Sequence, residues 1–171
     1  PKKFSRIVFI NAISIISLFF LLIYAVLETI NKEYIIAAVL YFVAFLGIFY
    51  IIRLNRTRKI AFSEYFIIII ASVLFLYLIV VGGPWKLGYI WSLLIPALSL
   101  ILLGLRRGTI FSAIYIALVV IIIAPGFSFM KTDYTPGFIL RFLTAYLAIY
   151  LLVYSYEYLR LLAISKLDKA R

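Results

Sequence analysis

Six long apolar runs, separated by short connections, constrain this chain more than any other feature. They cover residues 7–27, 34–52, 65–81, 87–105, 109–124 and 138–158. A helix needs about 20 apolar residues to cross the hydrocarbon core of a bilayer. The strands of a membrane barrel instead alternate apolar and polar residues, which runs such as 66–70 do not. The pattern predicts an all-α integral membrane protein, a bundle of six transmembrane helices.

Two details of these runs predict local departures from regular spans. The third and fifth runs are short, so we expect their helices to extend into the neighbouring connections. Pro96, inside the fourth run, removes a backbone hydrogen bond and is expected to kink that helix.

The composition excludes a soluble domain and most enzyme classes. Hydrophobic residues make up 67% of the chain and charged residues 13%, against roughly 45–50% and about 25% in soluble domains. The sequence has no Cys and no His, and only six acidic residues, so a metal cluster or an acid–base pair has little material. It also contains no phosphate-binding glycine motif and no nucleophile elbow. We expect neither an enzyme nor a bound cofactor.

The basic residues predict the orientation in the membrane. The net charge is +11, which in a soluble protein would suggest nucleic acid as a partner. Basic residues that flank apolar spans, however, mark the cytoplasmic connections. Thirteen of the 17 Lys and Arg residues fall on one side, and only Lys32, Lys86 and Lys131 fall on the other. We therefore expect both termini in the cytoplasm, the lipid bilayer as a partner, and no nucleic acid.

Arg141 is the one basic residue inside a predicted span. It lies about one turn into the sixth span from the outer side, where a charge is costly unless it reaches headgroups or an anion. Thr135 and Pro136 have the residue types of a helix N-cap and first turn, so free backbone N–H groups nearby would also attract an anion. One interpretation is a carboxylate or phosphate ligand. The other is snorkelling to headgroups, or a structural ion pair with an acidic residue such as Glu28 or Asp133.

Small and polar residues form stripes on three of the predicted helices, and such stripes usually face neighbouring helices. On the sixth span the stripe contains Arg141 and Thr144, opposite a row of four tyrosines at positions 146, 150, 154 and 158. If the stripes face inward, they line a cavity with aromatic walls, hydroxyls and one cation in the outer half of the bundle. The expected ligand-binding residues are Tyr24, Trp85, Tyr89, Ser92, Arg141 and Thr144. Ordinary helix packing with an aromatic belt at the interface is the alternative.

The sixth span has no visible end in the sequence. Residues 159–171 contain no Gly and no Pro and consist mostly of good helix formers. We therefore expect this span to continue as one rigid helix into the cytoplasm.

Three segments in the second half carry a resemblance. Residues 82–85, 89–96 and 102–108, GGPW, YIWSLLIP and LLGLRRG, resemble the six-span N-terminal sensor modules of bacterial diguanylate cyclases and related signalling proteins. Residues 159–171 are similar to the signalling helix that joins such modules to a GGDEF catalytic domain. The sequence itself contains no GGDEF motif, so it does not make cyclic di-GMP.

The resemblance implies a sensor in the bacterial cytoplasmic (inner) membrane. Residues 1–158 would be the six-span sensor domain, and residues 159–171 the start of a cytoplasmic helix that leads to an output domain. The output enzymes of this class act as dimers, which implies a homodimer with paired exit helices. The residues expected to transmit the signal are Tyr158, Leu161, Leu162 and Ser165.

The function expected from these features is that of a membrane receptor. It would bind a small anionic amphiphile, such as a fatty acid, in the outer half of the bundle and signal through the sixth helix to a diguanylate cyclase. The alternative is a small six-span transporter subunit, the substrate-binding membrane component of a vitamin importer.

The predicted orientation can be tested by thiol labelling. Cysteines that replace Arg56 and Met130, one in each kind of connection, should react with a membrane-impermeant reagent from opposite sides of the membrane. Labelling of both positions from the same side would contradict the predicted topology.

Overall fold

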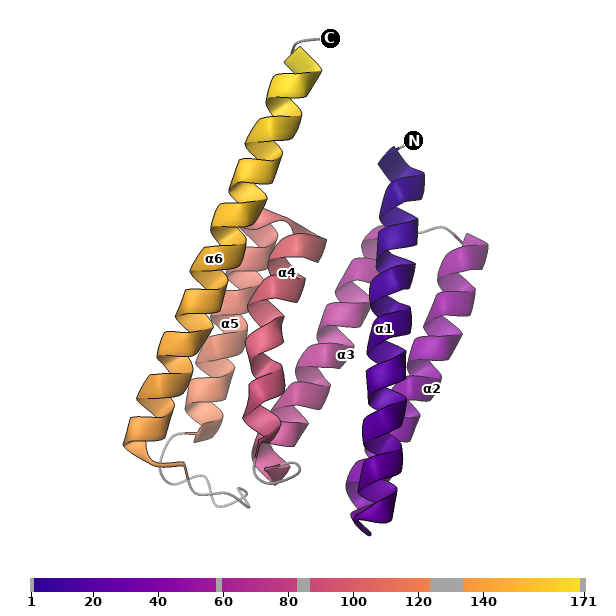
Figure 1. The fold of residues 1–171 in the computed structure, drawn as a ribbon, viewed down its shortest axis with the longest axis vertical. Helices are drawn as coiled ribbons and strands as arrows, with labels where there is room; N and C mark the ends of the chain where they lie inside the picture. The colour runs from indigo at the N-terminus through magenta and orange to yellow at the C-terminus, as the bar shows by residue number, and fades with distance from the viewer. Residues whose placement is uncertain (1, 58–59, 83–86, 124–133, 170–171) are drawn as a thin grey trace. The chain divides into compact units, whose positions relative to one another are not determined.

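Helices make up all the regular structure in the described residues. The computed structural model describes residues 2–57, 60–82, 87–123 and 134–169 (Figure 1). The elements are α1 (Lys2–Ile30), α2 (Tyr34–Thr57), α3 (Ile60–Val81), the 3-10 helix η2 (Gly88–Leu94), α4 (Ile95–Leu103), α5 (Leu105–Ile123) and α6 (Pro136–Lys169). Five of these helices are long and apolar enough to cross a membrane, and η2 with α4 forms a shorter apolar segment. The all-helical prediction is confirmed, and each predicted run coincides with one helical segment.

The chain divides into two compact units, Pro1–Ile70 and Ala71–Arg171, with the boundary inside α3. In the first unit α1 and α2 pack as a hairpin. Its turn is closed by backbone hydrogen bonds such as Glu33 N–H to Glu28 C=O at 3.0 Å, and Lys32 adopts a positive φ of 65°. The side chains of Asn11 and Asn55 join the other ends of the two helices by a hydrogen bond of 2.8 Å.

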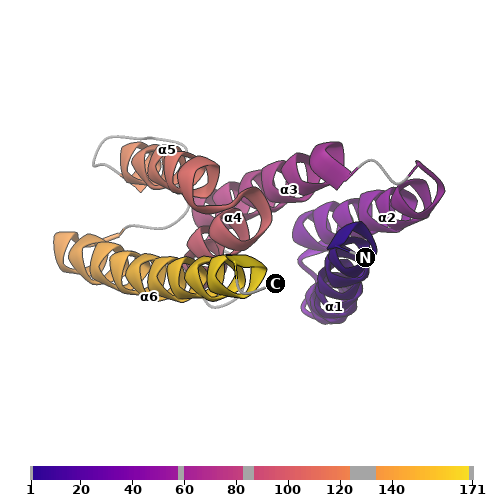
Figure 2. The ribbon, with the colours of Figure 1, turned by 90° about the horizontal axis from the view of Figure 1, so that it is seen from above.

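In the second unit α4, α5 and α6 each contact the other two helices and form a three-sided group when seen from above (Figure 2). The last part of α3 contributes Ile79 to their common core. Four of the six predicted ligand-binding residues are described in this unit: Tyr89, Ser92, Arg141 and Thr144. The packing of α6 within the unit decides which of them are buried.

The fourth span differs from the prediction of a kinked α-helix. It begins as the 3-10 helix η2 and becomes α-helical at α4, with Pro96 in the first turn of α4. The absent N–H of a proline costs nothing in a first turn, because those N–H groups have no partner within the helix. The proline therefore begins a helix instead of bending one.

Two glycines bring backbones into close contact in this unit. Gly104, with a φ of +80°, is the only residue between α4 and α5. One turn later, a Cβ atom on Gly108 would lie 2.5 Å from the carbonyl oxygen of Ser99. The turn and the close approach both require glycine, so α4 and α5 form a tight hairpin. The hairpin also places Arg106 and Arg107 in the first turn of α5 and not in a separate connection.

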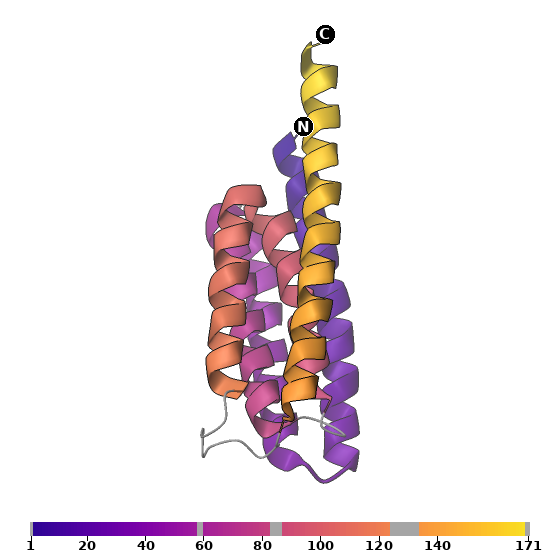
Figure 3. The ribbon, with the colours of Figure 1, turned by 90° about the vertical axis from the view of Figure 1, so that its left-hand side faces the viewer.

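The longest helix, α6, begins and continues as the sequence predicts. The Thr135 side-chain oxygen accepts a hydrogen bond of 3.3 Å from the Phe138 N–H, and Pro136 is the first helical residue. The helix then runs without interruption to Lys169 and extends well past the ends of α4 and α5 (Figure 3). The predictions of an N-cap at Thr135 and of a continuous sixth helix are confirmed.

Candidate functional site

The face that α6 turns toward α4 and α5 is the reverse of the predicted one. Phe142 and Tyr146 are buried, and Tyr150 and Tyr154 are half-buried. Arg141 and Thr144 are exposed, and so are Ala148, Leu152 and Ser155 of the same stripe. Within the second unit, therefore, the stripe of small and polar residues lies on the face of α6 that points away from α4 and α5, and it lines no space among these three helices.

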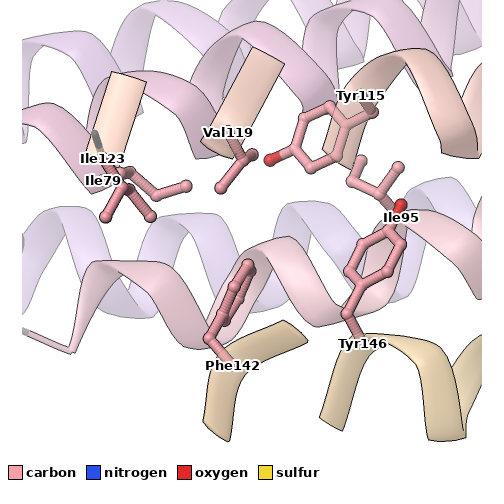
Figure 4. Close-up of a cluster of buried hydrophobic side chains, with 7 residues drawn as sticks. All are labelled: Ile79, Ile95, Tyr115, Val119, Ile123, Phe142 and Tyr146. Carbon is pink, nitrogen blue, oxygen red and sulfur yellow. The ribbon is translucent and has the colours of Figure 1, made fainter. Parts of the chain in front are cut away.

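The buried face of α6 meets a compact core (Figure 4). The core residues are Ile79, Ile95, Tyr115, Val119, Ile123, Phe142 and Tyr146. Figure 4 shows Phe142 and Tyr146 pointing from α6 toward side chains of the facing helices. Large aromatic side chains fill this space, and the polar ends of the tyrosines find partners inside it.

Three pairs of hydroxyl groups connect the helices of this unit. Their oxygen–oxygen distances are 2.7 Å for Ser92–Tyr115, 2.7 Å for Ser112–Tyr146 and 2.9 Å for Thr109–Tyr150. The Tyr146 hydroxyl also donates to the Ser112 carbonyl oxygen at 3.0 Å, so the Ser112 hydroxyl donates to Tyr146. We refer to these six side chains as the hydroxyl ladder. An unpaired hydroxyl is costly in an apolar interior, which explains why the tyrosine face of α6, and not the small-residue face, turns inward.

Ser92 and Tyr89 face inward as predicted but already have partners. Ser92 is fully buried and paired with Tyr115. The Tyr89 ring meets Phe138 edge to face, with the ring centroids 4.5 Å apart. The Tyr134 ring stacks on Phe138 at 4.7 Å. Ser92 therefore belongs to a contact between η2 and α5, and Tyr89 to a packed contact between η2 and α6.

Tyr134 anchors the chain just before α6. Its hydroxyl donates a hydrogen bond of 3.1 Å to the carbonyl oxygen of Ile79 in α3. Burial, with a smaller contribution from the nearby Tyr89, raises the pKa of Tyr134 to about 12. The phenol therefore stays protonated and remains a donor across the physiological range.

Arg141 and Thr144 lie together on the face of α6 that points away from α4 and α5, which we call its outer face. Thr144 donates to the Leu140 carbonyl oxygen one turn earlier. Arg141 forms no ion pair or hydrogen bond with any other described residue; its predicted alternative partner Asp133 lies outside the described residues, and Glu28 lies in the first unit. The positive N-terminal end of α6 adds to the charge of Arg141, so this part of the outer face attracts anions.

The other two predicted ligand-binding residues lie outside the described part of the second unit. Tyr24 is half-buried on α1 in the first unit, and Trp85 lies outside the described residues. The first-span stripe that contains Tyr24 faces partly inward, because Ser14 and Glu28 are buried and Ser17 is exposed. The structure thus groups Arg141 with Thr144, and Tyr89 with Ser92, on different sides of α6.

The predicted transmission residues occupy the last part of α6. All four are exposed: Tyr158, Leu161, Leu162 and Ser165. They lie in the segment of α6 that extends past the ends of α4 and α5 (Figure 3). Glu157 and Arg160 form an ion pair of 2.7 Å within α6 at the start of this segment.

A protein-family model, MASE6, matches residues 2–167, which is almost the whole chain. The chain belongs to the MASE6 family. MASE domains are membrane-associated, non-catalytic sensor modules of diguanylate cyclases and histidine kinases, so the resemblance found in the sequence is confirmed. Membership of MASE6 favours a sensor over a transporter subunit. Comparison with curated proteins and with solved structures gives no match.

The hydroxyl ladder of this MASE6 chain is the feature that sequence analysis missed. Its signal was present in the tyrosines of α6, which recur at every fourth residue, and in Thr109 and Ser112, which lie three residues apart on α5. The sequence prediction placed the tyrosines only on the face opposite the stripe of small and polar residues. Matching hydroxyls on two neighbouring apolar helices would have been the better guide.

The ladder predicts a coupling between two side chains of the MASE6 core. Tyr115→Phe leaves the Ser92 hydroxyl buried without its partner, so it should destabilise the protein by about 1 kcal/mol. The double variant Ser92→Ala/Tyr115→Phe should cost less than the sum of the two single variants, because it removes both polar groups. Tyr156→Phe, at an exposed position of α6, is the matched control. Denaturation in detergent measures these differences, and strictly additive effects would contradict the coupling.

Proposed function

We propose that this MASE6 chain is the sensory part of a homodimeric receptor in the bacterial inner membrane. In this proposal a small anionic amphiphile, such as a fatty acid, binds on the outer half of α6. The helix carries the resulting displacement to a cytoplasmic output domain, a diguanylate cyclase. Membership of a family of membrane-associated sensor modules supports the sensory role.

The observation that carries the transmission step is the continuity of α6. Its 34 residues span about 51 Å at 1.5 Å per residue, whereas the hydrocarbon core is about 30 Å thick. The helix therefore reaches about 20 Å beyond the core. A displacement at its outer end is transmitted along the helix without a flexible joint.

The ligand class follows from the outer face of α6. Arg141 supplies a guanidinium with no partner among the described residues, close to the positive end of the helix. Leu140 and Leu147 are exposed beside it, at 68% and 55%. An anionic headgroup at Arg141 and Thr144 with an acyl tail along these leucines satisfies the charge and covers the apolar surface. In this proposal the amphiphile lies against the outer face of α6, which points away from α4 and α5, and not in a cavity among these helices.

Binding of decanoate to the protein in zwitterionic nanodiscs tests the role of Arg141. Arg141→Gln should weaken decanoate binding at least about tenfold, because a hydrogen bond to a charged group contributes roughly 1.5–3 kcal/mol. Arg141→Lys should lose less, since it keeps the charge but not the bidentate geometry. Arg107→Gln, which removes an exposed arginine from α5, should bind as the wild type does. Isothermal calorimetry or a thermal shift measures the affinity.

Two results of this titration would contradict the ligand proposal. One is full affinity for decanoate in Arg141→Gln, which would leave the arginine with a structural role only. The other is equal affinity for decanoate and decanol in the wild type, which would show that the charged end of the amphiphile is not recognised.

The homodimer is supported by apolar side chains beyond the hydrocarbon core. Leu159, Leu161, Leu162 and Ile164 are exposed on the last part of α6, where water would otherwise cover them, and exposed apolar surface of this kind marks an interaction site. Single cysteines at positions 161 to 168 of the full-length protein should therefore crosslink in native membranes with the periodicity of a helix. A crosslinking yield that is uniform along the segment, or zero throughout, would contradict paired exit helices.

A further inference from the structure

Aromatic residues recur at every fourth position along the face of α6 that packs against α4 and α5, and the series continues to the exposed Tyr158. The series starts at Tyr134, just before the helix, and continues through Phe138, Phe142, Tyr146, Tyr150, Tyr154 and Tyr158. Side chains four residues apart form a ridge on a helix surface, and such ridges pack into the grooves of neighbouring helices. A shift of α6 by four residues along its axis would therefore replace each ring, except one at the end of the series, by another ring.

The hydroxyl groups of α6 match α5 in the observed register. Tyr146 pairs with Ser112, and Tyr150 pairs with Thr109. Tyr154, one turn further on, packs its ring 5.8 Å from that of Tyr150, but its hydroxyl has no hydrogen bond to another described residue. The series thus carries one more tyrosine, in a half-buried position, than the observed register uses.

We propose that α6 has a second hydrogen-bonded register against α5. In it the helix is displaced by one turn along its axis toward its N-terminal end, which is the predicted outer side of the membrane; we call this an outward shift. In this register Tyr150 takes the place of Tyr146 at Ser112, and Tyr154 takes the place of Tyr150 at Thr109. The displacement is four residues, or about 6 Å. Such one-turn shifts are discrete, because packed ridges are stable only at successive positions in a groove.

The same contacts show why the shift goes outward. An inward shift would bring Phe142 to Ser112, and phenylalanine offers no partner to that buried hydroxyl. An outward shift instead brings Phe142 to the position of Phe138, where it restores an aromatic contact with Tyr89. The ion pair between Glu157 and Arg160 lies within α6 and moves with the helix.

Two contacts of the observed register are lost on the shift. The Tyr134 hydroxyl leaves the carbonyl oxygen of Ile79, and Tyr146 moves to the apolar position of Phe142 beside the core. The observed register is therefore the more stable one without a ligand. A ligand changes the balance only if it binds the two registers with different affinities, so the signalling role of the shift rests on the proposed transmission through α6.

The shift can be measured as a distance in the full-length protein. The sequence has no native cysteine, so spin labels can be placed at Arg107→Cys and Ser165→Cys, two exposed positions on α5 and α6. An outward shift brings Ser165 closer to Arg107 by up to about 6 Å. Double electron–electron resonance in nanodiscs, with labelled protein diluted by unlabelled protein, reports both populations.

Two conservative variants should move the populations in opposite directions. Tyr146→Phe removes the Ser112 bonds of the observed register and makes the second register less costly, so a shorter distance should appear or grow. Adding Tyr154→Phe removes a bond that only the second register forms, so the double variant should lose much of that shorter component. Tyr156→Phe, which removes an exposed hydroxyl of the same helix, should match the wild type.

The proposal is overturned if Tyr146→Phe keeps the single wild-type distance, or if Tyr154→Phe does not reduce the shorter component. Neither result depends on any ligand, so failure of the register would leave the proposed binding at Arg141 standing. Conversely, loss of decanoate binding without any effect on the distances would concern the ligand proposal alone.

Discussion

The pairing of buried hydroxyl groups determines how α6 packs in this protein. Ser112 on α5 and Ser92 in η2 are buried among apolar helices, and Thr109 on α5 is half-buried there, so an unpaired hydroxyl at these positions is costly. Tyr115, Tyr146 and Tyr150 satisfy all three, at 2.7 to 2.9 Å. A helix bundle in lipid gains little from burying apolar side chains, since the lipid is equally apolar. The polar pairs and close packing therefore decide which faces meet, and the other faces of the helices follow from that choice.

Close packing comes from glycine at two points of the same unit. Gly108 lies against the backbone of Ser99, and Gly88 lies against the carbonyl oxygen of Leu78, so α4 packs tightly against α5 and η2 against the end of α3. Large aromatic residues of α6 then fill the groove beside the tight α4–α5 hairpin. The combination of small residues on one side and large residues on the other is a dense arrangement.

The arrangement separates the two tasks of a sensor on one helix. One side of α6 carries the tyrosines that bond to α5, whereas the opposite side carries Arg141 and exposed leucines. In our proposal, whatever binds the opposite side acts on a helix that can take two registers against α5. Because α6 is uninterrupted as far as Lys169, no flexible joint separates its two ends. This division fits a member of a family of membrane-associated sensor modules.

The sequence by itself determined the helices of this protein, and the tertiary structure decided which of their faces meet. Long apolar runs can cross lipid only as helices, because every backbone group must be satisfied within the segment, and the absence of Gly and Pro after Tyr158 predicted the continuous end of α6. Such local rules also predicted the cap at Thr135. The orientation of α6 was beyond them: its two faces, one with small residues and one with tyrosines, are both compatible with a buried position. Only the hydroxyls that α5 brings opposite α6, those of Thr109 and Ser112, select the tyrosine face, and that is a property of the two helices packed together.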